Sequence, residues 1–578
     1  MKYGTLTVGI IGLAIAAKAT DPIVGPQIRT DTNGGTAAAN ETSAASFGPL
    51  GNELVGTYND WRAGGETIRM GVSVSNDAGL TWTDFWVRPP VNFESSVEGD
   101  PMTAFDARTG TLWVGAISFR GGGGVFVARK DPGAKTFQPS VMARVSSGAD
   151  KCWMAAGPLP GNPNATNLYV TYNEGCLRSS DMGQTWSTPV NLGSGIGFNP
   201  KVAPNGNVYV TYWDFGTGVM FRKSTNGGVS FAAAVRAATR LDTWGTQDGS
   251  RGPGNFRKPP MNAIAVDPNT GHIYIAYFDT TNIVNGNRNL NLYMVKSTNE
   301  GVTWSTPAVI NADTDPPGDQ FFPWIEVDYK SRIHNTWFDG RNTVQNDTNV
   351  NGFYDNYYSF SDDGGDTWTE YRLTSSPWSS GNDGLNRSQQ FLGDYNALAF
   401  GGNRAYPYYL STQNGDPDIF TNIVIDPDVV PASYKIMRGE GGGSITTLFK
   451  SDDVRLSVDS VHLLASIGDA VIVVFDSTAP QQNPSSLVYR VESRTNVAGF
   501  THTIDLWNWT TARWDVVAVD SSSVSDEIIS TDVTGSSLHY IQNGTRKVRS
   551  RSRWRGNGSP SVPTLTAAID QVQWTVMP

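Results

Sequence analysis

The sequence predicts an all-β protein made of more than one structural unit, and its length, its composition and an internal repeat support this prediction. A chain of 578 residues is too long for one compact core, because single cores stop growing beyond roughly 250 to 300 residues. Glycine and aromatic residues are abundant, and only 17% of the residues are charged. This composition suits many short strands joined by turns and offers little to long helices.

An eight-residue motif recurs along the chain with the pattern Ser-x-Asp/Asn-x-Gly-x-Thr/Ser-Trp/Phe. Its copies begin at Ser75, Ser179, Ser224, Ser297 and Ser361. In a tight turn, an Asp or Asn side chain accepts hydrogen bonds from the nearby backbone, glycine adopts the left-handed conformation, and an aromatic residue anchors the next strand. Each copy therefore predicts a turn between two strands.

A second repeat alternates with the first and consists of an aromatic-rich strand that ends in an acidic residue. These strands end at Asp60, Glu174, Asp214, Asp279 and Asp339. Two less regular strands, at 112–118 and 405–411, occupy the remaining places in the pattern. The two repeats together predict about seven similar units.

The eight-residue motif resembles the Asp box of sialidases and related β-propellers, and the resemblance covers about residues 27–427. It implies an Asp-box β-propeller over residues 20–430 with about seven blades, one more than the catalytic propellers of sialidases have. The last blade has no Asp box after residues 418–425. We therefore expect the stretch 23–30 to supply its outer strand and to close the ring.

The pattern changes after Pro427. The glycine-rich residues 431–445 predict a linker, and residues 446–578 contain several short runs in which apolar and polar side chains alternate. These runs predict a C-terminal β-sandwich or jelly-roll domain that acts as an accessory binding module.

The N-terminus predicts export. Residues 1–19 have a lysine, an apolar run over 6–17 and small residues at the end, as a signal peptide does, and no later segment offers the roughly 20 apolar residues of a membrane span. We expect the protein to be secreted and extracellular, or to lie in the periplasm or at the cell surface. The net charge of -11 argues against a nucleic-acid partner.

The two cysteines, Cys152 and Cys176, flank a predicted hairpin over 153–172. In an oxidising compartment we expect a structural disulfide that closes this loop, and two free buried thiols are the alternative.

The first blade contains Asp60, Arg62 and Glu66, and this stretch is similar to the one in which a sialidase arginine precedes the acid/base carboxylate. The resemblance implies that Glu66 is the general acid/base and that Arg62, with Asp60 beside it, contacts the substrate. Sialidases normally have Asp at the position of Glu66. The alternative is that Arg62 pairs with nearby carboxylates.

The last blade contains GDYNALAF from Gly393, which resembles the segment that carries the sialidase nucleophile. Tyr395 is the matching residue. A phenol is a poor nucleophile unless a carboxylate takes its proton. Asp394 is its neighbour in the sequence, and Asp339 and Glu326 belong to the preceding blade. Tyr395 is alternatively a stacking platform or a core residue.

The arginines depart from the sialidase pattern. Where sialidases have an Arg-Ile-Pro motif at the opening of the first blade, this chain reads Asn40-Glu41-Thr42. Arg257 and Arg341 are other candidates to bind a ligand carboxylate, because a guanidinium can pair with it in a bidentate manner.

Other chemistries have less support. His272 and His334 lie within predicted strands of the propeller and the other three histidines lie in the second domain, so a Ser-His-Asp triad or a His-based metal cluster at the propeller centre would have no histidine pair to use. No cofactor is predicted, although the oxygen-rich stretch 346–356 is a candidate for a structural Ca²⁺. In the C-terminal domain, arginines alternate along 549–555 and need acidic neighbours such as Asp505 or Asp515, or an anionic ligand. Trp507, Trp509 and Trp514 are core residues or a platform for sugars.

The leading hypothesis is a secreted sialidase-like glycoside hydrolase, or a related protein that binds glycans, at the axial cleft of the propeller. A non-catalytic extracellular glycan-binding or adhesion protein, attached to a cell surface or matrix through its C-terminal domain, is the alternative, and a polysaccharide lyase is a third possibility. The hydrolase hypothesis requires Arg62, Glu66 and Tyr395 to converge in one pocket with further arginines.

Overall fold

The computed structural model describes residues 20–47, 52–119, 122–241, 257–284, 287–312, 318–342, 352–385, 390–461, 468–556 and 564–578. They divide into two compact units, Val24–Ile425 and a second unit formed by Asp426–Pro578 with the residues up to Ile23. Strands dominate both units. Within the described ranges the helical segments are short: α1 (Ser537–Tyr540), η1 (Val91–Phe93), η2 (Ile445–Leu448) and η4 (Thr534–Ser536).

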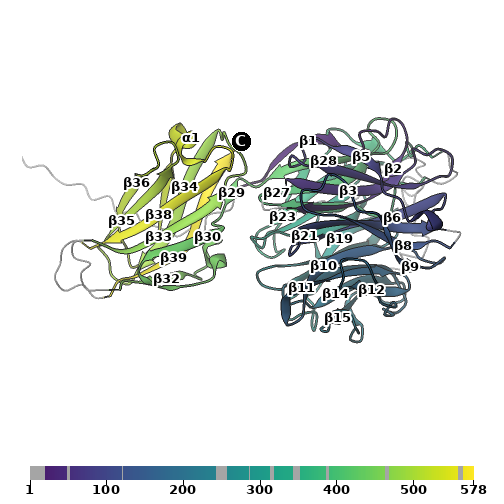
Figure 1. The fold of residues 1–578 in the computed structure, drawn as a ribbon, viewed down its shortest axis with the longest axis horizontal. Helices are drawn as coiled ribbons and strands as arrows, with labels where there is room; N and C mark the ends of the chain where they lie inside the picture. The colour runs from purple at the N-terminus through teal and green to yellow at the C-terminus, as the bar shows by residue number, and fades with distance from the viewer. Residues whose placement is uncertain are drawn as a thin grey trace, which may run out of the picture. The chain divides into compact units, whose positions relative to one another are not determined.

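The first unit contains seven antiparallel sheets among its described residues (Figure 1). Three of them come from its N-terminal half: β2 (Ala39–Phe47), β3 (Glu53–Asp60), β4 (Arg69–Ser75) and β5 (Thr83–Trp86); β6 (Val97–Asp106), β7 (Thr111–Phe119), β8 (Gly124–Lys130) and β9 (Val141–Val145); β10 (Trp153–Leu159), β11 (Asn162–Tyr172) and β12 (Gly175–Ser179).

The other four sheets follow in chain order. They are β13 (Ile196–Val202), β14 (Val208–Asp214), β15 (Gly218–Ser224) and β16 (Val235–Thr239); β17 (Ala263–Val266), β18 (Ile273–Val284), β19 (Asn287–Ser297) and β20 (Ala308–Val309); β21 (Gln320–Val327), β22 (Ile333–Asp339), β23 (Phe353–Ser361), β24 (Thr369–Arg372) and β25 (Trp378–Ser379); β26 (Ala397–Gly401), β27 (Arg404–Ser411), β28 (Asp418–Ile425) and β1 (Ile23–Arg29).

The first strands of these sheets contact one another in a closed order. β2 contacts β6, and the contacts continue through β10, β13, β17, β21 and β26 back to β2. In the last sheet the N-terminal strand β1 pairs with β28, and just after it the Thr30 amide donates to the Ile419 carbonyl at 2.8 Å. Strands from the two ends of the unit therefore share one sheet, which leaves β28 without a free edge.

The turns after β4, β12, β15, β19 and β23 carry the eight-residue motif, and the turn at Ser75 shows its geometry. Asp77 accepts from the amide and the hydroxyl of Thr81 at 2.9 and 2.6 Å, and the Ser75 hydroxyl accepts from the Gly79 amide at 2.9 Å. Gly79 has φ +85°, where a side chain would be strained, and Trp82 donates back to its carbonyl at 3.0 Å.

The inner strands begin with a shared irregularity. The β2–β3 ladder skips two residues between Asn40 and Ser43, and β6–β7 does the same between Gly99 and Met102. Glu41 and Asp100 lie within these skips and have left-handed backbones, with φ 54° and 50°. Lys151, just before β10, has φ 52°. A bulge turns side chains out of the regular alternation, so it fixes where the side chains of Glu41 and Asp100 point.

The second unit has two antiparallel sheets that contribute to one hydrophobic core. One contains β31 (Glu440–Gly442), β32 (Leu456–Asp459), β39 (Thr566–Met577), β34 (Ser486–Thr495) and β37 (Glu527–Asp532), with β29 (Asp428–Val429) paired to β39; the other contains β30 (Ser433–Arg438), β33 (Asp469–Thr478), β38 (Lys547–Arg555), β35 (Thr501–Asn508) and β36 (Arg513–Ser521).

Residues 433–442, which the sequence placed within a linker, form the strands β30 and β31. Gly441 has φ +131°, and a Cβ at this position would meet the Ser457 carbonyl at 2.4 Å. Glycine at this position therefore allows β31 to pair closely with β32, in addition to the flexibility that the sequence suggested.

The expected disulfide does not form, and both cysteines are free and buried. Thr171 on β11 pairs with Trp153 on one side and with Cys176 on the other, so β11 lies between the two cysteine-bearing segments. Two strand spacings amount to about 10 Å, beyond the roughly 7 Å that a disulfide can span between Cα atoms. The prediction failed because Cys176 lies on the third strand of the sheet, on the far side of β11 from Cys152.

Candidate functional site

An ionic cluster lies where the inner strands begin, and Lys151 is at its centre. The Lys151 ammonium lies 2.6 Å from Asp394, 3.0 Å from Asp100 and 3.4 Å from Glu41. All four side chains are at most 8% exposed. They come from four segments that are distant in sequence, and the closed order of strand contacts brings them together.

Arg257 covers this cluster and is its most exposed member, with 44% of its side chain accessible. Its Nε and Nη2 donate to the two oxygens of Asp394 at 2.8 and 2.5 Å, and Nη2 lies 3.8 Å from Glu41. The guanidinium also lies over the ring of Phe391 at 4.7 Å. Arg257 therefore combines a bidentate ion pair with a surface that a ligand can reach.

The environment separates the pKa values of the carboxyl groups. Burial raises the pKa of Glu41 to about 8, in spite of the opposing effect of Lys151. Burial also disfavours ionised Asp394, but Arg257 and Lys151 outweigh it and lower its pKa to about 2. At neutral pH the cluster thus combines a protonated Glu41 with an ionised Asp394.

An apolar layer formed by Trp153, Met261 and Tyr395 adjoins the cluster. The ring of Tyr395 lies 5.3 Å from that of Trp153, and Lys151 Nζ lies 5.8 Å from its centroid. Within the described ranges the Tyr395 hydroxyl has no hydrogen-bond partner, and burial followed by the charge of Glu41 raises its pKa well above 10. Neither Asp394 nor Asp339 is placed to take its proton.

Arg62 lies in a separate ion-pair group. It pairs with Asp60, and its Nη1 lies 2.6 Å from Asp84. The Asp60 carboxylate also accepts from the Trp86 indole at 2.9 Å. Glu66 is exposed, and none of the hydrogen bonds or ion pairs of the described residues involves it. Arg62 and Glu66 therefore do not join Tyr395 in one pocket.

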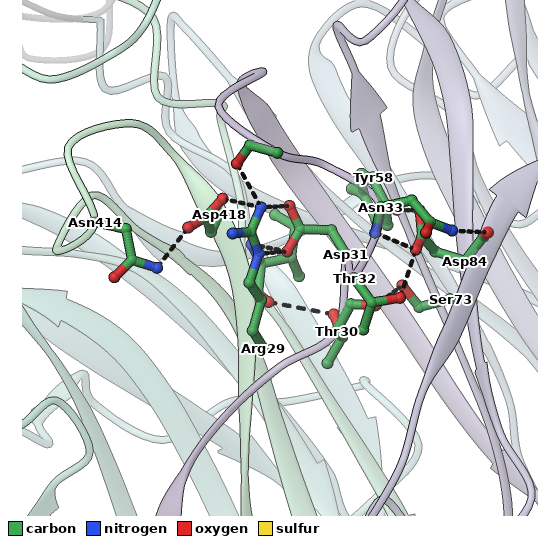
Figure 2. A network of polar contacts seen from close by, with 12 residues as sticks. Arg29, Thr30, Asp31, Thr32, Asn33, Tyr58, Ser73, Asp84, Asn414 and Asp418 are labelled. Carbon is green, nitrogen blue, oxygen red and sulfur yellow. Dashed lines mark hydrogen bonds and ion pairs between the residues drawn. The ribbon is translucent and has the colours of Figure 1, made fainter.

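Figure 2 shows that Asp84 belongs to a network around the N-terminal segment that follows β1. Asp84 accepts from the Thr32 hydroxyl and the Asn33 amide, each at 2.7 Å, and from the Tyr58 hydroxyl at 3.2 Å. Arg62, which the sequence assigned to a substrate site, thus pairs with a carboxylate, Asp84, that holds this segment to the first sheet.

Figure 2 also shows Arg29, which lies beside Asp31 and Asp418. Arg29 lies 3.0 Å from Asp31 and 2.5 Å from Asp418 on β28, and Asp31 accepts from the Ile419 amide at 3.1 Å. Burial raises the pKa of Asp31 to about 7 although Arg29 opposes this shift. These contacts fasten β1 to the last sheet.

Arg341 forms a third group. Its Nη2 lies 2.6 Å from Asp339 and its Nη1 lies 2.7 Å from Glu370. Arg62 and Arg341 are therefore both neutralised by protein carboxylates, and neither is placed as a free clamp for a ligand carboxylate.

Of the residues that the sequence singled out, the structure brings Arg257, Asp394 and Tyr395 together. Sequence reasoning missed Glu41, Asp100 and Lys151 as members of the cluster. They occupy equivalent places at the starts of β2, β6 and β10, so aligning the strand starts by repeat phase, instead of the strand ends, would have found them.

In the second unit, the arginines of β38 are balanced by carboxylates. Arg549 lies 2.5 Å from Asp476, and Arg551 and Arg553 lie 2.9 and 2.6 Å from Asp505. Arg551 also covers the ring of Trp514 at 4.4 Å. The expected acidic neighbour Asp505 is therefore present, whereas Asp515 pairs with Arg513 at 3.4 Å.

The described part of the chain contains no group of three or more His, Cys, Asp or Glu side chains that could hold a metal ion. Most of the stretch 346–356, the candidate for Ca²⁺, lies outside the described residues. None of the described helices has the length and apolar character needed to cross a membrane.

No family model and no curated protein matches the sequence. In structure the chain is similar to a protein of unknown function from Dyadobacter fermentans, with 13% identity over 70% of this chain and 99% of that chain, and a TM-score of 0.39. It is also similar to an α-L-arabinanase of Penicillium chrysogenum complexed with arabinobiose (12% identity, 70% and 99% covered, TM-score 0.37). A third similar structure is the intramolecular trans-sialidase of Ruminococcus gnavus in complex with oseltamivir carboxylate. It has 12% identity over 69% of this chain and 97% of that chain, and a TM-score of 0.37.

Proposed function

We propose that residues 24–425 form a seven-bladed Asp-box propeller closed by β1, and that residues 426–578 form a β-sandwich. The seven sheets, the closed order of contacts between their first strands and the pairing of β1 with β28 support this architecture. In a propeller the inner strands surround the axis. The Lys151 cluster then lies on the axis, at the face where the inner strands begin.

We infer that the protein is an exported glycan-binding protein and that this face binds the glycan. The observation that carries the proposal is Arg257, a half-exposed guanidinium fixed by Asp394 over a buried ionic cluster. Sugar hydroxyls accept hydrogen bonds from donors held at fixed positions, and the guanidinium of Arg257, held by Asp394, offers such donors. Glycans are proposed as the class of ligand because the eight-residue motif resembles the Asp box of sialidases.

The charge of the cluster favours a neutral glycan over a sialylated one. Lys151 and Arg257 are two cations, and the carboxylates of Asp100 and Asp394 are enough to balance them. Arg62 and Arg341 are occupied by other protein carboxylates. A ligand carboxylate would therefore have to compete with Asp394 for Arg257, and Asp394 would lose one of its two cationic partners.

The geometry favours binding without hydrolysis. A glycosidase needs two carboxyl groups that flank the scissile bond. Here Glu41 and Asp394 both face Lys151, whose ammonium occupies the space between them. Tyr395 has no base beside its hydroxyl within the described residues. The two histidines of the first unit, His272 and His334, lie at or just before the starts of β18 and β22, away from the cluster, and offer a lyase no central base.

The second unit is proposed as an accessory module for attachment to a cell surface or matrix. Trp507 and Trp514 form an edge-to-face pair at 5.2 Å on the sheet that carries the arginines of β38. Their rings are only partly buried, so they offer aromatic surface outside the core.

The test is binding of the secreted protein to an array that holds both neutral and sialylated glycans. Arg257→Ala should lower the affinity for the bound neutral glycans at least tenfold. Arg372→Ala is the matched control, because Arg372 is 35% exposed and also pairs with a buried carboxylate, Asp355. Retention confined to sialylated glycans, or equal binding by the wild type and Arg257→Ala, would contradict the proposal.

A further inference from the structure

A cavity of about 270 Å³ lies among the inner strands of the first unit, and the proposed function does not use it. Six of the seven first strands line it, with side chains downstream of the bulged strand starts. None of the cluster residues Glu41, Asp100, Lys151, Asp394 or Arg257 lines it. The cavity is therefore distinct from the face that carries Arg257.

The apolar layer separates the cavity from the ionic cluster. Trp153 lines the cavity and packs against Tyr395 with its ring tilted, and Tyr395 in turn lies against Lys151. Trp324, another lining residue, packs against the same layer. A ligand in the cavity would consequently contact one side of this layer, while the cluster occupies the other.

The cavity contains polar groups at fixed positions. Lys201 Nζ lies 2.5 Å from Glu326, and the Trp324 indole donates to the same carboxylate oxygen at 3.2 Å. Lys201 and Glu326 keep 27% and 20% of their side chains exposed. Among the described residues the buried indole N–H of Trp153 has no acceptor. The cavity thus has a partly exposed donor and acceptor at fixed positions, and a Trp153 indole N–H buried in its wall is not satisfied by any described residue.

The rest of the lining combines the polar residues Ser43, Thr103 and Asn199 with small residues such as Ala44 and Ala156 and with the aromatic rings of Trp324 and Phe400. A charged ligand would have to break the Lys201–Glu326 pair, whereas a neutral one can bond to both partners and leave their charges compensated. Pockets for small ligands commonly measure about 300 to 1,000 Å³, so this one suits a molecule at the small end of that range.

We propose that this cavity is a second binding site, which takes a small neutral polyhydroxylated ring such as a single pyranose or furanose. The ring would place its apolar face on Trp324 and bond its hydroxyls to Lys201 and Glu326. This site is independent of the proposed glycan-binding face.

The probes are glucose, galactose, xylose and arabinose, each titrated against the full-length secreted protein by calorimetry. Ala44→Leu fills the cavity without changing its charge, and Lys201→Met removes the donor. Both variants should weaken binding of the best probe at least tenfold. Lys223→Met is the matched control, because Lys223 forms a comparable half-exposed pair with Glu300, at 3.2 Å, outside the cavity. It should bind as the wild type does.

Thermal unfolding of each variant shows whether it is folded, and Ala156→Leu replaces Ala44→Leu if the latter is not. Arg257→Ala separates the two proposals. Probe binding that survives Arg257→Ala but is lost in the cavity-filling variant supports the cavity site. Binding lost in Arg257→Ala and kept in the cavity-filling variant overturns the cavity site and leaves the proposed function standing. Absence of binding for all four probes also overturns it.

Discussion

The Lys151 ammonium lies 2.6 Å from Asp394 Oδ2, and the same carboxylate accepts both Nε and Nη2 of Arg257. One buried carboxylate thus joins a cation that is almost fully buried to one that is half exposed. Removal of either partner affects the stability of the inner ring and the proposed binding face together.

Lys151→Met should destabilise the first unit by about 3 to 5 kcal/mol, because it leaves Asp100 and Asp394 buried without their shared cation. The free energy of unfolding in urea measures the effect. The double variant Lys151→Met with Asp394→Asn should recover part of the loss. A loss below about 1 kcal/mol in the single variant would show that the buried charges are relieved in another way.

Glu41 should make the protein less stable as the pH rises. Burial raises its pKa from 4.5 to about 8, so the folded protein holds this proton more tightly than the unfolded chain does. The stabilising contribution is therefore complete below about pH 4.5 and is lost as the pH rises through about 8.

Glu41→Gln keeps the shape of the protonated acid and should remove this pH dependence, so that the variant exceeds the wild type in stability at pH 9. Urea unfolding at several values between pH 5 and pH 9 measures it, with exposed Glu66→Gln as the control. Parallel stability curves for Glu41→Gln and the wild type would refute the expectation.

Tyr395→Phe should change the free energy of unfolding by less than about 1 kcal/mol, and in either direction, because the hydroxyl has no hydrogen-bond partner in the described part of the chain. Binding of neutral glycans should be unchanged as well. Chemical denaturation and the glycan array measure the two effects. Abolished sugar release from any glycan in this variant would reinstate Tyr395 as a nucleophile.

Asp31→Ala should loosen the N-terminal strand. It removes the acceptor of Arg29 and of the Ile419 amide, and unsatisfied buried groups cost about 1 to 3 kcal/mol each. We expect faster proteolytic cleavage near β1 and a lower melting temperature than for Asp77→Ala, whose carboxylate bonds only within an exposed turn. Equal effects of the two substitutions would argue that Asp31 does not fasten β1.

Cys152 and Cys176 should both react as free thiols after unfolding and neither should react in the native protein. Burial raises the pKa of Cys176 to about 12 and that of Cys152 well above 9, so both stay as thiols. A thiol reagent should count two groups per chain in denaturant without reductant. A count of zero that rises on reduction would restore the disulfide.

The sequence by itself determined the features that depend on local spacing. The turn motifs give the repeat, since their hydrogen bonds join residues at most four apart, as Asp77 and Thr81 show. Strand alternation and the change of pattern after Pro427 are local in the same sense, and so is the acid that ends each aromatic strand. These signals led to Asp60 and Asp339, but not to Asp84 and Glu370, the second carboxylates that bind Arg62 and Arg341.

Only the tertiary structure decided which charges meet. Glu41, Asp100, Lys151 and Asp394 come from segments separated by tens to hundreds of residues, and the closed order of contacts between the first strands of the sheets brings them together. Tertiary contacts also pair Arg62 and Arg341 with neighbouring carboxylates. Strand pairing places β11 between the two cysteines. Ion pairs and disulfides depend on distances in space, because electrostatic attraction and covalent reach both fall off within a few ångströms, and sequence spacing does not encode them.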